Sequence, residues 1–146
     1  MRPVRDFESF IRDGIVTKRS PDVARSKSLV MESECSYRFL IGVVEKMGTE
    51  DENANNIIKS AYDIVMELIR ARMLLAGFDA SGQGAHEAEV SYMRKLDFSE
   101  GDVRFADQLR YFRNGMTYYG KMLDREYAEK VLNFLEKVRS RLSIHG

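Results

Sequence analysis

The sequence is short of the residues that end helices and of those that cross-link chains. Its 146 residues include two prolines, Pro3 and Pro21, so no proline interrupts the long stretch that follows Pro21. The only cysteine, Cys35, excludes an internal disulfide and fits a reducing compartment. We interpret Cys35 as a small, buried or half-buried apolar residue rather than a reactive thiol.

An excess of one charge and long hydrophobic runs are also missing. Lys and Arg together number 23, and so do Asp and Glu, which gives a formal net charge of zero. This balance argues against a surface coated in basic residues for duplex binding, although a local basic patch is compatible with it. No apolar run approaches the length of about 18 residues that a membrane span needs. No signal-type apolar stretch follows the first residues. We therefore expect a cytoplasmic protein with no membrane span.

What the sequence does contain is helical patterning in almost every segment. Hydrophobic residues make up 44% of the chain and charged residues 32%, a balance typical of a soluble globular protein. Apolar residues recur at helical spacing, and no alternating run indicates a strand. We predict an all-α fold: an antiparallel helical bundle of four to six helices with two long central helices. We expect one domain over residues 1–146, with its core at about 20–142.

Capping residues and glycines predict where each helix begins and ends. Ser20 is the expected N-cap of the first long helix, with Pro21 at its first helical position. Asp124 is the expected cap of the last helix. The segment 78–84 is rich in glycine and is the one clear loop expected. The predicted helices are 6–13, 20–47, 49–76, 85–96, one that starts at Ser99 and reaches about Met116, and 124–142.

The segment 49–76 has the strongest pattern. Its apolar residues cover more than half of a helix circumference, and they are Ile57, Ile58, Ala61, Ile64, Val65, Leu68, Ile69 and Leu75. Its polar residues fall within roughly a 100° arc at about 100° per residue. They are Asn56, Lys59, Ser60, Asp63, Glu67 and Arg70. A helix with so wide an apolar face packs against several neighbours, so we predict that this one is central.

The polar arc contains a spacing that has two interpretations. Asp63, Glu67 and Arg70 lie four and three residues apart, which places them on one helix face. They are either a pair of carboxylates with a cation or an ordinary solvated face. The sequence leaves both open.

Arg72 interrupts the apolar face of the same segment, in line with Val65 and Leu68. A buried guanidinium without partners is costly. Arg72 therefore either reaches solvent or terminal carbonyls close to Gly77, or faces a subunit interface or a polar cleft shared with Arg113.

The sequence contains no recognisable metal or nucleotide motif. His86 and His145 are isolated, without Cys, Asp or Glu at the spacing of metal ligands. The glycines at 82 and 84 lack the strand and the lysine of a phosphate-binding loop. We predict no metal and no cofactor.

The stretch 109–120, LRYFRNGMTYYG, contains the clearest candidates for a site. Arg113 and Asn114 lie at the end of an apolar helix, and Tyr118 and Tyr119 follow. Arg and Asn can grip a phosphate through several donors, and Tyr can stack on a base or donate its hydroxyl.

The spacing inside this stretch limits what one chain can assemble. Five residues turn about 140° around a helix, so Arg113 and Tyr118 point in different directions. They share a site only if Gly115 or Gly120 loosens the helix, or if a second subunit completes it. The alternative is that Arg113 pairs with an acid while the tyrosines are core residues.

Three segments, taken in order, resemble the HEPN superfamily of helical bundles. They are residues 61–77 (AYDIVMELIRARMLLAG), residues 84–88 (GAHEA), and residues 111–114 (YFRN) with the tyrosines that follow. The resemblance covers roughly residues 20–142. It implies a homodimer in which two Arg-bearing helix ends meet across the interface. Many such domains are metal-independent ribonucleases of toxin–antitoxin or defence systems, and others bind nucleotides or pair with a small nucleotidyltransferase.

The chain departs from the active motif of that family, an Arg and a His separated by four to six intervening residues. Arg113 and Asn114 match the start, but the His position falls on Tyr118, Tyr119 or Gly120. RNA cleavage through the 2′-hydroxyl needs a proton acceptor that works near pH 7. Tyrosine, with an unperturbed pKa of about 10, is a poor base.

The resemblance therefore implies a dimeric RNA- or nucleotide-binding component with weak or no nuclease activity. The candidates for catalysis are Arg113 and Tyr118. The candidates for binding are Arg113, Asn114, Tyr118, Tyr119, Arg72 and His86. One alternative is a metal-independent ribonuclease in which Tyr118 or His86 replaces the missing histidine. The other is a bundle that binds only other polypeptides.

Overall fold

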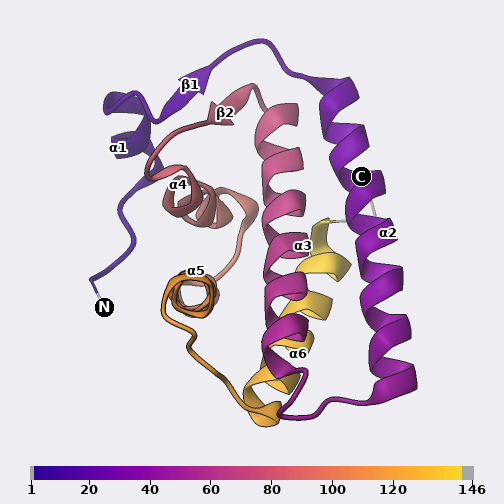
Figure 1. The fold of residues 1–146 in the computed structure, drawn as a ribbon. Helices are drawn as coiled ribbons and strands as arrows, with labels where there is room; N and C mark the ends of the chain where they lie inside the picture. Colours follow the sequence, from indigo (N-terminus) through magenta and orange to yellow (C-terminus); the bar gives the residue numbers. More distant parts are fainter. Residues whose placement is uncertain (1, 143–146) are drawn as a thin grey trace.

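A computed structural model describes residues 2–142 apart from the side chain of Tyr118, and it is a mostly helical bundle (Figure 1). The described helices are α1 (Phe7–Arg12), α2 (Val23–Met47), α3 (Ala54–Leu75), α4 (Ala85–Tyr92), a 3-10 helix η1 (Met93–Leu96), α5 (Glu100–Tyr118) and α6 (Arg125–Leu142). The described strands are β1 (Val16–Lys18) and β2 (Phe78–Ala80). The predicted helical bundle with α2 and α3 as its long helices is confirmed.

The two long helices are antiparallel neighbours joined by a short turn (Figure 1). α2 ends as predicted at Gly48, whose N–H donates to the carbonyl of Val44 at 2.8 Å. α3 begins at Ala54, so the predicted start at position 49 is wrong. The reason is Asn53, whose side chain accepts from the N–H of Glu50 at 2.9 Å and donates to the Gly48 carbonyl at 3.0 Å. These two bonds hold residues 49–53 in a turn.

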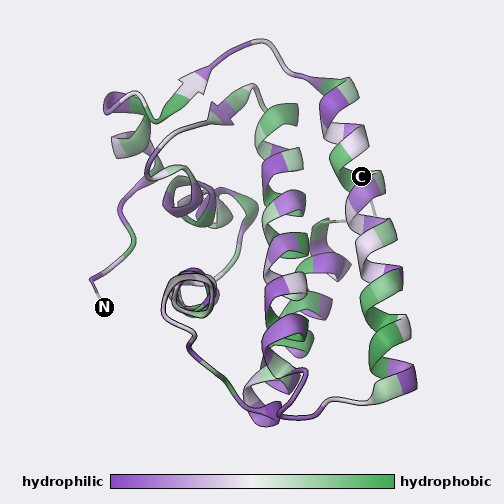
Figure 2. Cartoon of the chain, viewed as in Figure 1, coloured by the Kyte–Doolittle hydropathy of each residue, from purple (hydrophilic) through white to green (hydrophobic). Residues whose placement is uncertain are grey.

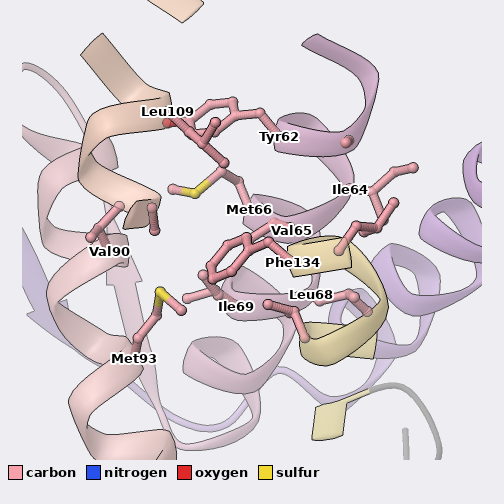
Figure 3. Close-up of a cluster of buried hydrophobic side chains, with 14 of the residues drawn as sticks. Tyr62, Ile64, Val65, Met66, Leu68, Ile69, Val90, Met93, Leu109 and Phe134 are labelled. Carbon is pink, nitrogen blue, oxygen red and sulfur yellow. The ribbon is translucent and has the colours of Figure 1, made fainter. Parts of the chain in front are cut away.

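α3 is the central helix, as predicted. It lies between α2 and the pair α4 and α5, with α6 behind it (Figure 1). Its buried residues are Ala54, Ile57, Ile58, Ala61, Tyr62, Ile64, Val65, Met66, Leu68, Ile69, Ala71, Met73 and Leu74. Figure 2 shows its polar residues as purple segments on the face toward the viewer. Figure 3 shows Phe134 of α6 packed beside Val65 and Ile69 in the core. Each large side chain buried in this way contributes about 1.5–3 kcal/mol.

A small antiparallel sheet connects the start of the chain to the end of α3. β1 pairs with β2 in the register Val16 with Ala80, Thr17 with Asp79 and Lys18 with Phe78. The prediction of no strand is therefore wrong, and so is the prediction of a loop at residues 78–80. Each strand has three residues, which is too short for alternation to appear in the sequence.

The same pairing delays the start of α2. The N–H groups of Arg19 and Asp22 donate to the carbonyls of Gly77 and Leu74 at 2.8 and 3.0 Å, which holds this segment beside the end of α3. α2 then begins at Val23, and the N-cap is Asp22 rather than Ser20. Asp22 accepts from the N–H of Arg25 at 3.0 Å.

The remaining boundaries follow the capping residues. Ser99 accepts from the N–H of Asp102 at 3.1 Å, and Asp124 accepts from the N–H of Tyr127 at 2.9 Å, so both predicted caps are confirmed. The predicted helix 85–96 changes to 3-10 geometry at Met93. Among the helices described, none has both the length and the apolar character needed to cross a membrane.

Candidate functional site

Arg113 lies on α5 and faces the polar strip of α3. Its Nη1 donates to Thr117 Oγ1 at 2.6 Å, and its Nε lies 3.7 Å from Asp63 Oδ1. The guanidinium remains 32% exposed. Arg113 thus pairs with an acid, as the more conservative of the two interpretations predicted, but it stays at the surface.

The neighbours of Arg113 are also at the surface. Asn114 is exposed, and Tyr119 is 86% exposed. Tyr111 is exposed as well, with the Arg110 guanidinium 4.8 Å from its ring centre. The interpretation of the tyrosines as core residues is therefore wrong for Tyr111 and Tyr119. The side chain of Tyr118 lies outside the described part of the chain.

The backbone does not bring positions 113 and 118 together. α5 continues as a regular helix through Gly115 to its end at position 118. Gly120 has a positive φ of 65° but lies beyond the helix. Within one chain, neither glycine produces the loosening that a shared site of Arg113 and Tyr118 requires.

A second polar cluster lies about 10 Å further along α3, since seven residues rise by that distance. Arg70 donates to both carboxylate oxygens of Glu89 on α4, through Nε at 2.7 Å and Nη2 at 3.1 Å. His86 Nδ1 lies 3.2 Å from the same carboxylate. Glu89 is 2% exposed, so it is a buried carboxylate that contacts three nitrogen atoms from two side chains.

The electrostatics of Glu89 follow from these contacts. Burial alone would raise the pKa of its carboxyl, but the hydrogen bonds from His86 and Arg70 outweigh burial and hold the pKa below its usual range. The same bond raises the pKa of the Arg70 guanidinium. His86 is therefore held against Glu89 on α4, rather than beside Arg113 on α5.

Between the two clusters lies the buried phenol of Tyr62. Figure 3 shows its ring beside Leu109 in the core. Its hydroxyl has no hydrogen-bond partner among the described residues. Burial, and then the negative charge of Glu89, raises the pKa of this phenol well above its usual range. Tyr62 thus stays neutral and acts as a packing residue.

A further ion pair lies within α5, between Arg110 and Asp107. Arg110 Nε donates to Asp107 Oδ1 at 2.8 Å, and Asp107 is buried. The sequence patterns did not point to Asp107, Glu89 or Tyr62. The signal that could have found the first two is the spacing of three that separates Asp107 from Arg110 and His86 from Glu89.

The polar strip of α3 is divided between its neighbours. Asp63 faces Arg113 on α5, whereas Arg70 binds Glu89 on α4. Glu67 is half-buried, and burial together with the nearby charge of Glu32 raises the pKa of its carboxyl. Asp63, Glu67 and Arg70 therefore form neither a carboxylate pair with a shared cation nor a fully solvated face.

Arg72 belongs to a different part of the molecule. Its Nη2 donates to the carbonyl oxygen of Leu142, at the end of α6, at 2.8 Å. Nine residues separate Arg72 from Asp63, which is about half a turn in direction, so the two point to opposite sides of α3. Arg72 binds a terminal carbonyl, as one interpretation predicted, but this carbonyl is at the end of α6 and not close to Gly77. A cleft shared with Arg113 is excluded within one chain.

A groove between α2 and α3 was not predicted. It encloses about 370 Å³ and is lined by Cys35, Ser36, Phe39, Ser60, Asp63, Ile64 and Glu67. Cys35 is exposed here, so its interpretation as a buried or half-buried residue is wrong. Asp63 belongs to this groove and to the Arg113 pair, so the groove and the pair are neighbours.

No family model, curated protein or solved structure matches the chain.

Proposed function

We propose that the protein binds the phosphate of an RNA or a nucleotide through Arg113, as a HEPN-like component of a toxin–antitoxin or defence-type system. The observation that supports this best is the exposure of the Arg113 guanidinium together with the contacts that it makes. It is partly exposed and is oriented by Thr117, while Asp63 lies beyond hydrogen-bond distance at 3.7 Å. A guanidinium has five donors in a fixed fork, and these contacts engage only its Nε and Nη1.

The surroundings of Arg113 provide the other groups that such a ligand needs. The amide of Asn114 adds donors, and the exposed ring of Tyr119 offers a face on which a base can stack. Asp63 is exposed and can turn toward solvent when a phosphate takes its place. Binding would therefore exchange a loose ion pair for a charge-assisted, bidentate contact.

Cleavage of the bound RNA is expected to be weak or absent. His86 is held by Glu89 about 10 Å along α3 from the Asp63–Arg113 pair, so the described part of one chain offers no imidazole there, and His145 lies outside the described residues. The alternative is a metal-independent ribonuclease that uses Tyr118 or His86. Incubation of purified protein with RNA in the presence of a chelator separates the two, because cleavage above an Arg113→Ala control would support the enzyme.

We further propose that the protein acts as a homodimer in the cytoplasm, with a small nucleotidyltransferase as a partner protein. The resemblance in residues 61–77, 84–88 and 111–114 supports this part. A second candidate function is a bundle that binds only polypeptides. The exposed side chains of Met31, Phe39 and Met47 on α2 favour it.

The experiment is a titration of fluorescent single-stranded RNA, with ADP and ATP as competitors, followed by anisotropy. Arg113→Ala should weaken binding by about 10- to 150-fold, because a charge-assisted hydrogen bond contributes about 1.5–3 kcal/mol. Arg104→Ala is the matched control, since Arg104 is an exposed arginine on the same helix, about half a turn away in direction. Equal affinities of the two variants would contradict the proposal.

Asp63→Asn tests the exchange directly. It removes the carboxylate that competes with the phosphate for Arg113, so it should bind the same RNA more tightly than the unchanged protein. Weaker binding by Asp63→Asn would show that Asp63 positions Arg113 instead of competing for it.

A further inference from the structure

α2 presents a broad face to solvent that is centred on the direction of Phe39, and at about 100° per residue Met31 and Met47 point about 80° to either side of it. Met31 is 69% exposed, Phe39 75% and Met47 66%. Figure 2 shows green, hydrophobic segments in the half of α2 that leads to α3. Phe39 is therefore the large exposed apolar side chain at the centre of this face, where a partner would cover it.

Phe39 stands between hollows in this face. On one side lies the 370 Å³ groove that α2 forms with α3, which adjoins a second groove of about 410 Å³ lined by Leu40, Val43, Met47 and residues of α3. On the other side is a shallow depression beside Gly42. A face that carries both a projecting aromatic side chain and hollows of this kind is suited to a second copy of itself, since a two-fold interface uses one patch twice.

The charges on this face select the orientation of the second copy. Glu32 precedes Phe39 by seven residues and Lys46 follows it by seven, and both are exposed. At about 100° per residue, both lie within roughly 20° of the direction of Phe39. In an antiparallel pair centred on Phe39, Glu32 of each copy lies opposite Lys46 of the other. In a parallel pair, Glu32 would face Glu32 of the other copy and Lys46 would face Lys46, so like charges would repel each other.

We propose that this face of α2 is the interface of a homodimer in which two α2 helices pack antiparallel about a two-fold axis at Phe39. The small residues Cys35 and Gly42, on either side of Phe39, allow the two helices to approach closely. The approach of Lys46 from the second copy also brings positive charge to Glu32, which otherwise lies near the carboxylate of Glu67. Of the proposed function, this inference rests only on the claim that the protein is a homodimer.

The size of the face sets the expected affinity. The stretch from Met31 to Met47 is about 24 Å long, and a helix is about 10 Å wide. This strip covers about 240 Å² on each copy, so even with the adjoining grooves the interface belongs to the weak class that buries less than about 1,200 Å² in total. The dimer is therefore expected to dissociate in the micromolar range.

Sedimentation equilibrium over a range of about 1–200 µM, which brackets a micromolar dissociation constant, tests the inference on the full chain. The unchanged protein should be dimeric at the upper concentrations, and Phe39→Glu should be monomeric throughout. Leu75→Glu is the matched control, because Leu75 is an exposed apolar residue at the end of α3, and it should leave association unchanged. A protein that is monomeric at every concentration, or a Phe39→Glu variant that still dimerises, would overturn the inference.

Charge reversal tests the orientation without changing the apolar contact. Glu32→Lys alone and Lys46→Glu alone should each weaken association by more than about tenfold, because each creates two like-charge pairs per dimer. The double variant restores two opposite-charge pairs and should return to within about threefold of the unchanged protein. Failure of the double variant to recover would exclude the antiparallel register.

The two proposals fail independently. A monomeric protein whose RNA binding still depends on Arg113 removes the inference about α2 and leaves the binding proposal. A dimer broken by Phe39→Glu, in a protein without Arg113-dependent binding, removes the binding proposal and leaves the interface.

Discussion

α2 and α3 are the two longest helices of the described chain, yet their roles differ sharply. α2 has 25 residues, of which Ser26, Ser33 and Leu40 are buried. α3 has 22 residues, of which thirteen are buried. The difference lies in the distribution of apolar residues. Those of α3 form one wide continuous face, whereas those of α2 are divided between an inner side with Leu40 and an outer side with Phe39.

The inner side of α2 packs against α3 through small residues. The hydroxyl of Ser26 donates to the carbonyl of Ala71 on α3 at 2.7 Å, and that of Ser33 donates to the carbonyl of Val30 at 2.7 Å. Both hydroxyls are thereby satisfied without a bulky side chain between the helices. α2 thus contributes a covering layer, while α3 contributes the core itself.

Truncation of the core face of α3 should give the largest effect. Leu68→Ala removes a side chain that is almost fully buried, so it should lower the free energy of unfolding by about 2–5 kcal/mol. Met31→Ala on the outer face of α2 is the matched control and should change it by less than about 0.5 kcal/mol. Urea unfolding at a concentration where the protein is monomeric measures both. Similar losses for the two variants would show that the outer face of α2 is buried in the monomer.

Loss of the Glu89 carboxylate should give the next largest effect. Glu89→Gln keeps the shape of the side chain but leaves Arg70 without its bidentate partner, at a cost of about 1–3 kcal/mol because Arg70 is only partly buried. Because the folded pKa of Glu89 is depressed, its contribution is present above the usual carboxyl pKa of about 4.3 and is lost as the pH falls through the folded pKa.

Urea unfolding at several pH values checks this dependence. The difference in stability between the unchanged protein and Glu89→Gln should be constant near neutral pH and should shrink at acidic pH. A difference that grows as the pH falls would contradict the depressed pKa. Glu100→Gln serves as a control, because Glu100 is an exposed acid paired with Arg94 and its loss should cost less than about 1 kcal/mol.

The smallest effect should be a gain. Tyr62→Phe removes a buried hydroxyl that has no partner among the described residues, so it should stabilise the fold by about 1 kcal/mol. The change in stability of Tyr62→Phe is compared with that of Tyr92→Phe, since Tyr92 is another buried tyrosine, on α4. A loss of stability in Tyr62→Phe, measured by thermal unfolding, would mean that its hydroxyl has a water partner.

The sequence predicted the parts of the fold that local patterns determine. The apolar residues of 57–69 recur in the sequence at the helix period, and this wide apolar face correctly identified the central helix. Ser99 and Asp124 were recognised because an N-cap bonds to a backbone N–H only two or three residues away. The start of α2 was missed because it depends on bonds from residues 19 and 22 to the end of α3.

The candidate site was less accessible to prediction. The period of α3 placed Asp63 on a polar strip, but no local pattern shows that α5 lies beside that strip and brings Arg113 to it. The same limit applies to Arg72, whose acceptor is seventy residues away in the sequence. The acceptor, the carbonyl of Leu142, lies at the end of a different helix, and this can be known only from the assembled bundle.

The contact between Arg72 and the carbonyl of Leu142 has a consequence for synthesis of the chain. α6 covers one side of α3, and its last described residue provides the acceptor for Arg72. On the ribosome α3 emerges long before α6, because synthesis runs from the N-terminus. During that interval its apolar face is uncovered and Arg72 lacks this acceptor, so the nascent chain up to about residue 124 is the form that most needs protection from aggregation.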